Sequence, residues 1–208
     1  MKKFSTTPVS KVFGFDRGKP IDRYYIENFL NQHKSAIHGH VLEIGDNAYT
    51  RKYGTAVKKS DVLDINKTKY STIVGDLATG KNISASTFDC IILTQVLHVI
   101  YDIRAVIENT LNALKPGGVL LLTTTGISQY CGNGNYGDYW RFTDLSLKKL
   151  FAEVGSRNEI KVNSHGNVAV AKAFLDGLAL HEIPKKVLNV HDRNYQVVIT
   201  AFVQKAAI

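Results

Sequence analysis

The stretch Val-Leu-Glu-Ile-Gly-Asp, residues 41–46, is the part of the sequence that decides the fold. It joins a short apolar run, residues 40–44, to a glycine that is followed by polar residues. Runs this short and this apolar are typical of parallel strands that are covered on both faces of a sheet. Gly45 then permits a sharp turn and a close approach of the backbone to a ligand. We therefore expect a first strand of an α/β sheet here, followed by a ligand-binding turn.

Four more apolar runs follow, at residues 61–65, 71–74, 88–94 and 119–124. Between the last two, apolar residues recur at helical spacing over residues 103–114, and Lys-Pro-Gly-Gly at 115–118 is a stop signal for that helix. Because strands and helices alternate, this order predicts a doubly wound α/β sheet with right-handed crossovers.

The two flanks of this region have different patterns. Residues 1–19 are polar and predict an irregular arm, after which Pro20 opens an amphipathic helix, so we treat residues 1–35 as an N-terminal arm and helix. On the other flank we expect a helix capped by Thr143, a strand at 160–162, a helix at 168–180 capped by Asn167 and a strand at 195–203. The last two strands follow a long connection late in the chain, and we expect them to form an antiparallel pair at one edge of the sheet.

Length and composition exclude several classes of protein. The chain has 208 residues, of which 44% are hydrophobic and 21% charged, as in an ordinary single globular domain spanning residues 1–208. The run 90–100 is too short and too polar to cross a membrane, and the first eight residues lack the apolar core of a signal peptide. We therefore expect a cytoplasmic protein without membrane insertion.

The net charge and the cysteines indicate which partners and bound metals to expect. The net charge of +8 favours anionic partners in general, but the basic residues are scattered in pairs, so we do not expect nucleic acid. Cys90 lies in an apolar run and Cys131 among glycines, and neither has a metal-ligand spacing to histidine or cysteine. The sequence accordingly predicts no bound metal.

Acidic residues follow the ends of the first three predicted strands. Glu43 lies at the end of the first, Asp64 at the end of the second and Asp76 just after the third. In an open α/β sheet, ligands bind outside these strand ends. Asp64 could accept hydrogen bonds from both hydroxyls of a nucleoside ribose, and Asp76 one from an adenine amino group. Each acid alone could instead form a turn or cap a helix, but three in this order favour a nucleoside site.

The first turn lacks the Gly-x-Gly-x-x-Gly pattern, because Asn47 and Tyr49 stand where further glycines would be expected. A dinucleotide pyrophosphate needs bare backbone at a helix N-terminus, so a nicotinamide oxidoreductase is disfavoured. A cofactor with a nucleoside and no phosphate, such as S-adenosylmethionine, fits this turn better.

At these residues the sequence resembles class I S-adenosylmethionine-dependent methyltransferases, and most of all the bacterial group associated with glycosyltransferases and glycan biosynthesis. The segments that carry the resemblance are Gly18-Lys-Pro-Ile-Asp-Arg-Tyr-Tyr-Ile26, Leu42-Glu-Ile-Gly-Asp46, Val74-Gly-Asp-Leu77, Leu93-Thr-Gln-Val-Leu97, Leu114-Lys-Pro-Gly-Gly118, Gly137-Asp-Tyr-Trp-Arg-Phe-Thr143 and His165-Gly-Asn-Val168. The segment at 137–143 is the most specific of them.

The resemblance implies a Rossmann-like seven-stranded sheet with strand order 3-2-1-4-5-7-6, in which strand 7 is antiparallel. It also implies S-adenosyl-L-methionine as the cofactor. The residues it assigns to cofactor binding are Glu43, Gly45, Asp46, Tyr49, Asp64, Ile65, Asp76, Leu77, Thr94 and Gln95. The glycine-poor first turn departs from the broad superfamily, which leaves the roles of Asn47 and Tyr49 open.

The acceptor side is expected after the fourth and fifth strands. A hydroxyl acceptor needs a base as its proton leaves, and the candidates are His98 and Asp138, with Asp102 as a further one. His98 could instead be a packed or half-exposed helix histidine, and Asp138 a loop or turn aspartate. Tyr139, Trp140 and Arg141 are candidate substrate-binding residues or, alternatively, a plug that seats the next helix. The glycines and aromatic residues of 126–141 suggest a lid.

Two functions from different classes remain open. One is O-methylation of a sugar or glycan precursor, with a small-molecule or glycan acceptor. The other is a non-catalytic Rossmann-like binding module that partners a glycosyltransferase. The intact acids Glu43, Asp64 and Asp76 favour the enzyme. Methyltransferases acting on amino groups of nucleic acids have Asn/Asp-Pro-Pro-Tyr after strand four, whereas residues 94–97 here are Thr-Gln-Val-Leu.

Overall fold

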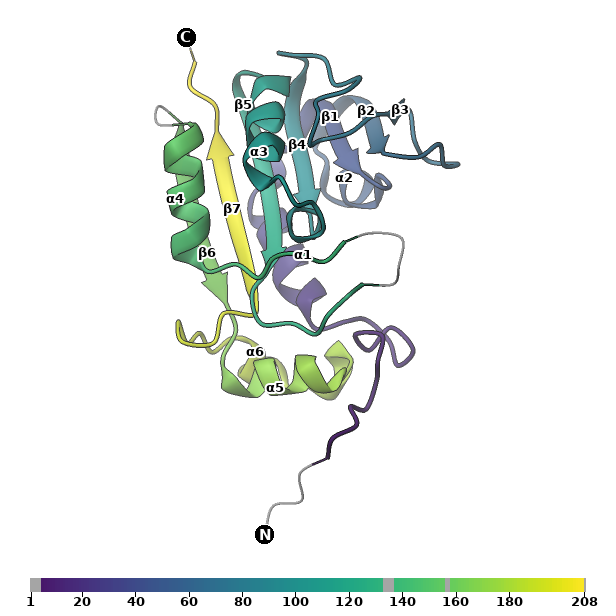
Figure 1. Cartoon of the computed structure of the whole chain (residues 1–208), viewed down its shortest axis with the longest axis vertical. Helices are drawn as coiled ribbons and strands as arrows, with labels where there is room; N and C mark the ends of the chain where they lie inside the picture. Colours follow the sequence, from purple (N-terminus) through teal and green to yellow (C-terminus); the bar gives the residue numbers. More distant parts are fainter. Residues whose placement is uncertain (1–4, 133–136, 156–157, 208) are drawn as a thin grey trace.

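A computed structural model describes residues 5–132, 137–155 and 158–207. It contains one seven-stranded sheet with the order β3-β2-β1-β4-β5-β7-β6 (Figure 1). The strands are β1 (His38–Ile44), β2 (Ala56–Asp64), β3 (Ile73–Val74), β4 (Phe88–Thr94), β5 (Leu114–Thr125), β6 (Glu159–His165) and β7 (Val198–Gln204). Strands β1 to β5 pair in parallel, and β7 is antiparallel to both β5 and β6. The predicted doubly wound sheet, its order and its antiparallel strand are confirmed.

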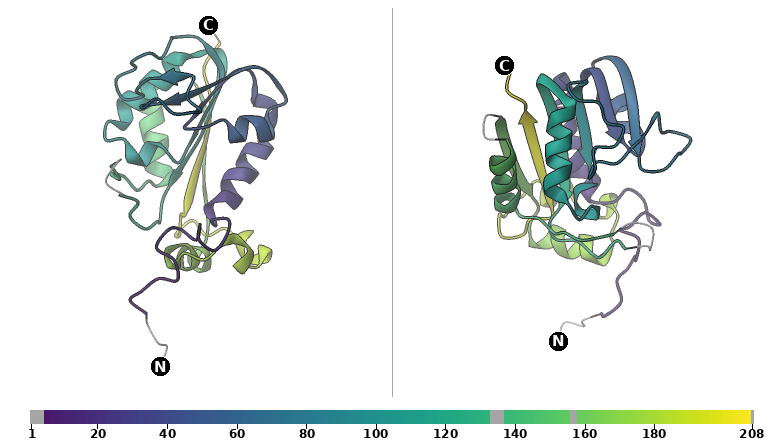
Figure 2. Two further views of the ribbon diagram at one scale, coloured as in Figure 1. Left: turned by 90° about the vertical axis from the view of Figure 1, so that its right-hand side faces the viewer. Right: turned by 45° about the horizontal axis from the view of Figure 1, so that its top comes forward.

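Helices cover both faces of this sheet. They are α1 (Asp22–Gln32), α2 (Ala48–Tyr53), α3 (Ile103–Ala113), α4 (Asp144–Val154), α5 (Val168–Asp176) and α6 (Lys185–Leu188). Short 3-10 turns lie at Lys34–Ala36, Leu97–Val99 and Leu180–Glu182. Figure 2 (left) shows α1 and α2 on one side of the sheet and α3 and α4 on the other, and each side has its own buried apolar cluster. In the described ranges, no helix is long and apolar enough to cross a membrane.

The predicted helix caps are present. The Thr143 hydroxyl accepts from the backbone N–H of Ser146 at 3.1 Å, which fixes the start of α4. The Asn167 side chain accepts from the first turn of α5 and donates to the carbonyls of Val187 in α6 and Val190 just after it, which joins these two helices. Helix α5 ends at Asp176 instead of residue 180, because Gly177 adopts a left-handed φ of +75° that ends the helix.

Several strands start or end at residues that the apolar runs did not predict. β2 begins at Ala56, and its first residues are polar and largely exposed, so they carry no apolar signal. β5 begins directly after α3, so the predicted helix stop at 115–118 is the first part of this strand. β6 is longer than predicted and β7 starts later, at Val198. Their antiparallel pairing sets these limits.

The N-terminal arm, described from residue 5, lies against the end of α5. The backbone N–H of Ser10 donates to the Asp176 carbonyl at 3.1 Å, and Arg17 forms an ion pair with Glu182. Phe13 packs on Phe174 with ring centroids 6.1 Å apart. Figure 1 shows this arm at the end of the sheet where β4 and β5 finish. The arm is therefore placed beside the edge where ligands bind in this class of sheet.

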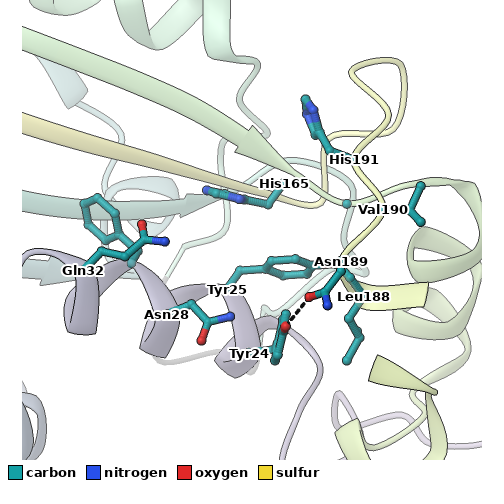
Figure 3. Close-up of a pocket in the computed structure, with 11 residues that line it drawn as sticks. Tyr24, Tyr25, Asn28, Gln32, His165, Leu188, Asn189, Val190 and His191 are labelled. Carbon is teal, nitrogen blue, oxygen red and sulfur yellow. Dashed lines mark hydrogen bonds between the residues drawn. The ribbon is translucent and has the colours of Figure 1, made fainter. Parts of the chain in front are cut away.

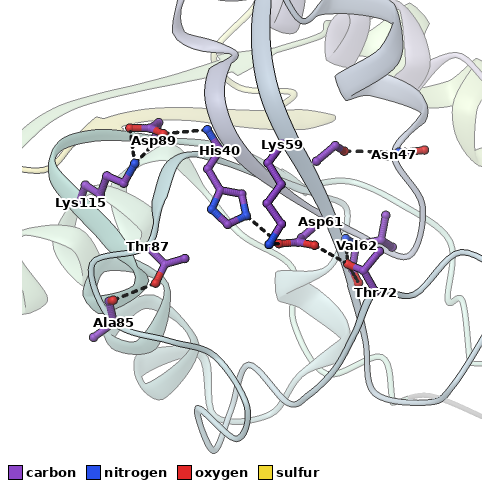
Figure 4. Close-up of polar contacts among 11 residues, drawn as sticks. His40, Asn47, Lys59, Asp61, Val62, Thr72, Ala85, Thr87, Asp89 and Lys115 are labelled. Atoms are coloured by element: carbon purple, nitrogen blue, oxygen red, sulfur yellow. Dashed lines mark hydrogen bonds and ion pairs between the residues drawn. The ribbon is translucent and has the colours of Figure 1, made fainter.

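A polar network holds the strands together away from that edge (Figure 4). Asp61 on β2 accepts from the Thr72 hydroxyl at 2.8 Å, contacts the His40 ring at 2.6 Å and forms an ion pair with Lys59 at 2.9 Å. Asp89 at the start of β4 accepts the backbone N–H of His40 at 2.7 Å. We call His40, Lys59, Asp61 and Thr72 the paired network, since each of its polar side chains has a partner.

Candidate active site

A cavity of about 520 Å³ lies at the C-terminal ends of β1, β2 and β3. Its described lining residues are Ile44, Gly45, Leu63, Asp64, Ile65, Gly75, Asp76, Leu77, Ala78, Val96, Val99, Ile100, Tyr101, Gly137 and Tyr139. Five of the residues predicted to bind a cofactor are in this wall. The strand-end rule, applied to three separate acidic turns, therefore leads to one cavity, which we call the strand-end cavity.

Gly45 supplies the bare backbone of this cavity. Its φ is +85°, a conformation that favours glycine, and its N–H donates to the Leu63 carbonyl at 2.9 Å. A Cβ added at this position would meet no atom within 4 Å. The turn after β1 is therefore fixed by backbone conformation while the space beside it stays open.

Asp64 and Asp76 form turns and also line the strand-end cavity. Asp64 Oδ1 accepts the N–H of Asn66 at 2.9 Å, and Asp76 Oδ1 accepts that of Ala78 at 2.8 Å. Asp76 Oδ2 also accepts from the Thr79 hydroxyl at 3.2 Å. The alternative interpretation of these acids as turn formers is thus correct for both. A carboxylate has about four acceptor positions, so each retains capacity for a ligand.

Glu43 does not line the strand-end cavity. Its side chain stabilises the turn between β1 and α2 through hydrogen bonds. Its buried carboxylate accepts from the backbone N–H groups of Tyr49 and Thr50 and from the Thr50 hydroxyl, at 3.0, 2.7 and 2.7 Å. Burial raises the pKa of Glu43, although these hydrogen bonds oppose the shift. Tyr49 packs against Tyr53, and burial raises its pKa to about 12. Glu43 therefore positions the start of α2.

A second cavity, of about 230 Å³, lies beside the ends of β4 and β5, and we call it the arm cavity. Its described lining residues are Phe13, Phe15, Pro20, Asp22, Arg23, Gln95, His98, Val99, Thr125, Ser128, Gln129, Cys131, Arg141, Phe174, Val197 and Val198. Val99 lines both cavities, so the two are neighbours. Of the predicted residues, Gln95, His98 and Arg141 lie here, whereas Thr94 and Asp46 line neither cavity.

His98 is buried in the wall of the arm cavity, with 7% of its surface exposed. Burial lowers the pKa of its imidazole to about 4, so the ring is neutral at pH 7. Its Nδ1 is buried and has no hydrogen-bond partner in the described chain. A neutral ring has one N–H and one lone pair, which suits it to exchange a hydrogen bond with a ligand.

Asp138 and Arg141 are bound to each other. The guanidinium donates to both Asp138 oxygens, at 2.5 and 2.8 Å, and the Cys131 N–H donates to Oδ2 at 2.6 Å. The hydrogen bond from Arg141 lowers the pKa of Asp138, so this carboxylate stays ionised and is a weak proton acceptor. Asp102, the third candidate base, caps α3 by accepting the Ala105 N–H at 3.1 Å.

Tyr139 lies where a ligand-binding residue is expected, whereas Trp140 packs as a structural plug. Their backbone N–H groups donate to the His98 carbonyl at 2.9 and 3.3 Å, which ties this segment to the residues after β4. Tyr139 lines the strand-end cavity and contacts Tyr101 edge to face, whereas the Trp140 indole donates to the Tyr101 carbonyl at 3.1 Å and packs on the core. Part of the predicted lid, residues 133–136 with Gly134, lies outside the described residues.

A third cavity, of about 170 Å³, lies between α1 and the segment after α6 (Figure 3). His165 stacks on Tyr25 there, and its Nε2 lies 3.0 Å from the Thr200 hydroxyl. The Tyr25 hydroxyl donates to the Leu188 carbonyl at 3.0 Å. In the described ranges, none of the buried side-chain atoms without a partner belongs to this cavity, and no three His, Cys, Asp or Glu side chains are grouped as a metal site.

Asp22 and Thr125 of the arm cavity were not predicted as site residues. In the sequence, Asp22 is simply an acid in the first turn of a helix, where the helix dipole favours it. Thr125 ends a run of three threonines that closes the apolar strand β5, and this run was the available signal. The two residues are far apart in the sequence and meet only through the fold.

Residues 9–160 match a family model described as "Methyltransferase domain". This match covers most of the chain, so the protein belongs to the methyltransferase-domain family, and the class suggested by the sequence motifs is confirmed.

Solved structures agree on the fold. The N-methyltransferase NodS from Bradyrhizobium japonicum WM9, in complex with S-adenosyl-L-homocysteine, matches with a TM-score of 0.57 and 15% identity, covering 95% of this chain and 94% of that one. An S-adenosylmethionine-dependent methyltransferase from Mesorhizobium loti matches with a TM-score of 0.59 and 12% identity, covering 92% of this chain and 100% of that one. These likenesses establish the S-adenosylmethionine-dependent methyltransferase fold.

Among curated proteins, the probable polyketide synthase 7 of Dictyostelium discoideum is 31% identical over 81 residues. The matched stretch is 38% of this chain and only 3% of that much longer protein. This chain therefore spans only a small part of that relative's length, and the match assigns it neither an activity nor an acceptor.

Proposed function

We propose that this protein is an S-adenosylmethionine-dependent methyltransferase that transfers the methyl group to a hydroxyl of a sugar or glycan precursor. The observation that carries the proposal is the strand-end cavity, in which Gly45 and Asp64 lie at the ends of adjacent strands. Membership in the methyltransferase-domain family supports the same activity.

The residues of the strand-end cavity suit this cofactor. Asp64 would accept hydrogen bonds from the ribose hydroxyls, and Gly45 leaves open space beside the turn for the rest of the molecule. Leu77, Val99 and Ile100 form an apolar wall for the adenine ring. When bound, S-adenosylmethionine supplies a methyl group that its positively charged sulfur already activates for displacement.

The chain's own contribution is to bind, to orient and to exclude water. Holding an acceptor in line with an activated methyl group can supply several kcal/mol of the barrier. Tyr139 and Tyr101 line the strand-end cavity, are exposed and contact each other edge to face, so they would limit the entry of water around a bound cofactor. His98 is the favoured base, because it is neutral and its buried Nδ1 is unpartnered, whereas Asp138 is held by Arg141.

The sugar or glycan acceptor rests on sequence and chemistry. The segment 137–143 carries the resemblance to methyltransferases associated with glycosyltransferases, and it borders both cavities through Tyr139 and Arg141. A glycosyltransferase acting on the same glycan is the partner that this proposal implies.

The test is a methyl-transfer screen with methyl-labelled S-adenosylmethionine and a panel of nucleotide sugars and oligosaccharides. We expect labelled product from at least one member of the panel, and at least about tenfold less with Tyr139→Ala, equal to about 1.4 kcal/mol of transition-state stabilisation. Transfer only to amines would contradict the hydroxyl acceptor. Cofactor binding without transfer to any compound would identify a binding module instead.

A further inference from the structure

The arm cavity contains most of the buried polar atoms that lack a partner. In the described chain there are four such side-chain atoms: Asp22 Oδ1, His98 Nδ1, Thr124 Oγ1 and Thr125 Oγ1. Asp22, His98 and Thr125 all line this one cavity, and each residue is at least nine-tenths buried. Leaving a buried polar group unpaired costs about 1–3 kcal/mol, so this concentration at one place points to a ligand that completes the bonds.

The rest of the wall is aromatic and apolar. Phe13 and Phe15 come from the N-terminal arm, Phe174 comes from α5, and the two valines at the start of β7 complete this side. Phe15 is well exposed, with the Arg23 guanidinium 5.8 Å from its ring centroid. A ligand in this cavity therefore meets flat apolar surfaces beside a small number of hydrogen-bonding groups.

The charges around the arm cavity are already paired. Asp22 Oδ2 accepts from Arg23 at 2.9 Å, and Arg141 is bound to Asp138. Among the described residues, both carboxylates here already have an arginine counter-ion, so a charged ligand gains no unpaired charge, while Asp22 Oδ1 stays open to a hydrogen bond. The arm cavity offers hydrogen bonds and apolar contact, which is what a neutral ring with several hydroxyl groups requires.

We propose that the arm cavity is the acceptor subsite and that it binds a neutral pyranose ring through Asp22, His98 and Thr125. This inference rests on the proposed function, because Val99 places the arm cavity next to the strand-end cavity where the cofactor would lie. It assigns a binding role to Asp22 and to the N-terminal arm. In this proposal Asp22 and Thr125 bind the acceptor directly.

The test is ligand-observed NMR binding of methyl glycosides of the common hexoses and 6-deoxyhexoses, with S-adenosylhomocysteine present. We expect at least one glycoside to bind, and Asp22→Asn and Thr125→Val each to weaken it by about tenfold, the cost of one lost hydrogen bond to a buried group. The matched control is His191→Gln in the third cavity. This variant should leave the affinities for the glycoside and for S-adenosylhomocysteine unchanged.

Thr125→Val separates a ligand-binding role from a structural one. The Thr125 hydroxyl has no partner in the described chain, so a methyl group of the same shape should keep or raise the melting temperature while glycoside binding is lost. Failure of every glycoside to bind while S-adenosylhomocysteine binds, or equal binding by wild type and both variants, would overturn the subsite. Failure of S-adenosylhomocysteine itself to bind would instead overturn the proposed function.

Discussion

Asp61 contacts the His40 ring and accepts from the Thr72 hydroxyl, whereas Asp22 and Thr125 each have a buried oxygen atom that lacks a partner among the described residues. Asp61, Asp22 and Thr125 are all buried, whereas His40 is half-buried and Thr72 is exposed. In the paired network, the polar side chains stabilise the folded chain without any ligand. In the arm cavity, the same kinds of side chain cost stability until something binds. The difference separates polar residues that hold the fold from those that serve a ligand.

The largest expected effect is on the paired network. Asp61→Ala removes the acceptor for Thr72 and the partner of His40 and Lys59, so the free energy of unfolding should fall by about 3 kcal/mol, measured by urea denaturation. The control is Asp46→Ala, whose exposed carboxylate accepts only from the Ala48 N–H. Equal losses in the two variants would mean that Asp61 has no special role in the fold.

Acid should destabilise the protein through His98. Its pKa falls from 6.5 in the unfolded chain to about 4 in the fold, so the unfolded state binds more protons between these values. Stability contributed above pH 6.5 is therefore lost as the pH falls, by about 2 kcal/mol between pH 7 and pH 5. His98→Gln should flatten this slope in denaturation curves. An unchanged slope would show that the ring is not held neutral.

Replacing Glu43 should lower the stability of the fold directly and the affinity for S-adenosylhomocysteine indirectly. Glu43→Ala frees two N–H groups and a hydroxyl at the start of α2, which should cost about 1.5 kcal/mol of unfolding free energy. Affinity for S-adenosylhomocysteine should fall along with it, because the turn at Gly45 loses its support. A fall in affinity at unchanged stability would instead indicate that Glu43 touches the ligand.

The smallest effect should come from Lys59. Its side chain is 63% exposed, so its ion pair with Asp61 is screened by water. Lys59→Ala should change the free energy of unfolding by no more than about 0.5 kcal/mol in thermal or urea denaturation. A loss comparable to that of Asp61→Ala would place the energy of the paired network in its surface charge instead of its buried hydrogen bonds.

The sequence contained enough to predict the sheet, because buried parallel strands have continuous apolar runs. β1, β4 and most of β5 were recognisable for that reason. The first half of β2 was not, since it is polar and exposed, and only its pairing with β1 makes it a strand.

The candidate site was predictable where topology alone brings residues together. Gly45, Asp64 and Asp76 follow neighbouring strands, so the rule for strand ends placed them in one cavity. The arm cavity depends on how the arm and α1 pack across the sheet, which periodicity does not specify. For the same reason the sequence indicated Arg141 as a candidate substrate-binding residue, while in the fold its guanidinium binds Asp138.

The most direct test of the account is the affinity for S-adenosylhomocysteine, measured by calorimetry on wild type, Asp64→Ala and Asp61→Asn. Asp64 lines the strand-end cavity, so Asp64→Ala should weaken binding at least about tenfold, or about 1.4 kcal/mol, and lower the melting temperature only slightly, through the lost turn hydrogen bond to Asn66. Asp61→Asn should lower the melting temperature and keep the affinity. Full affinity in Asp64→Ala, or no binding by the folded wild type, would contradict the account.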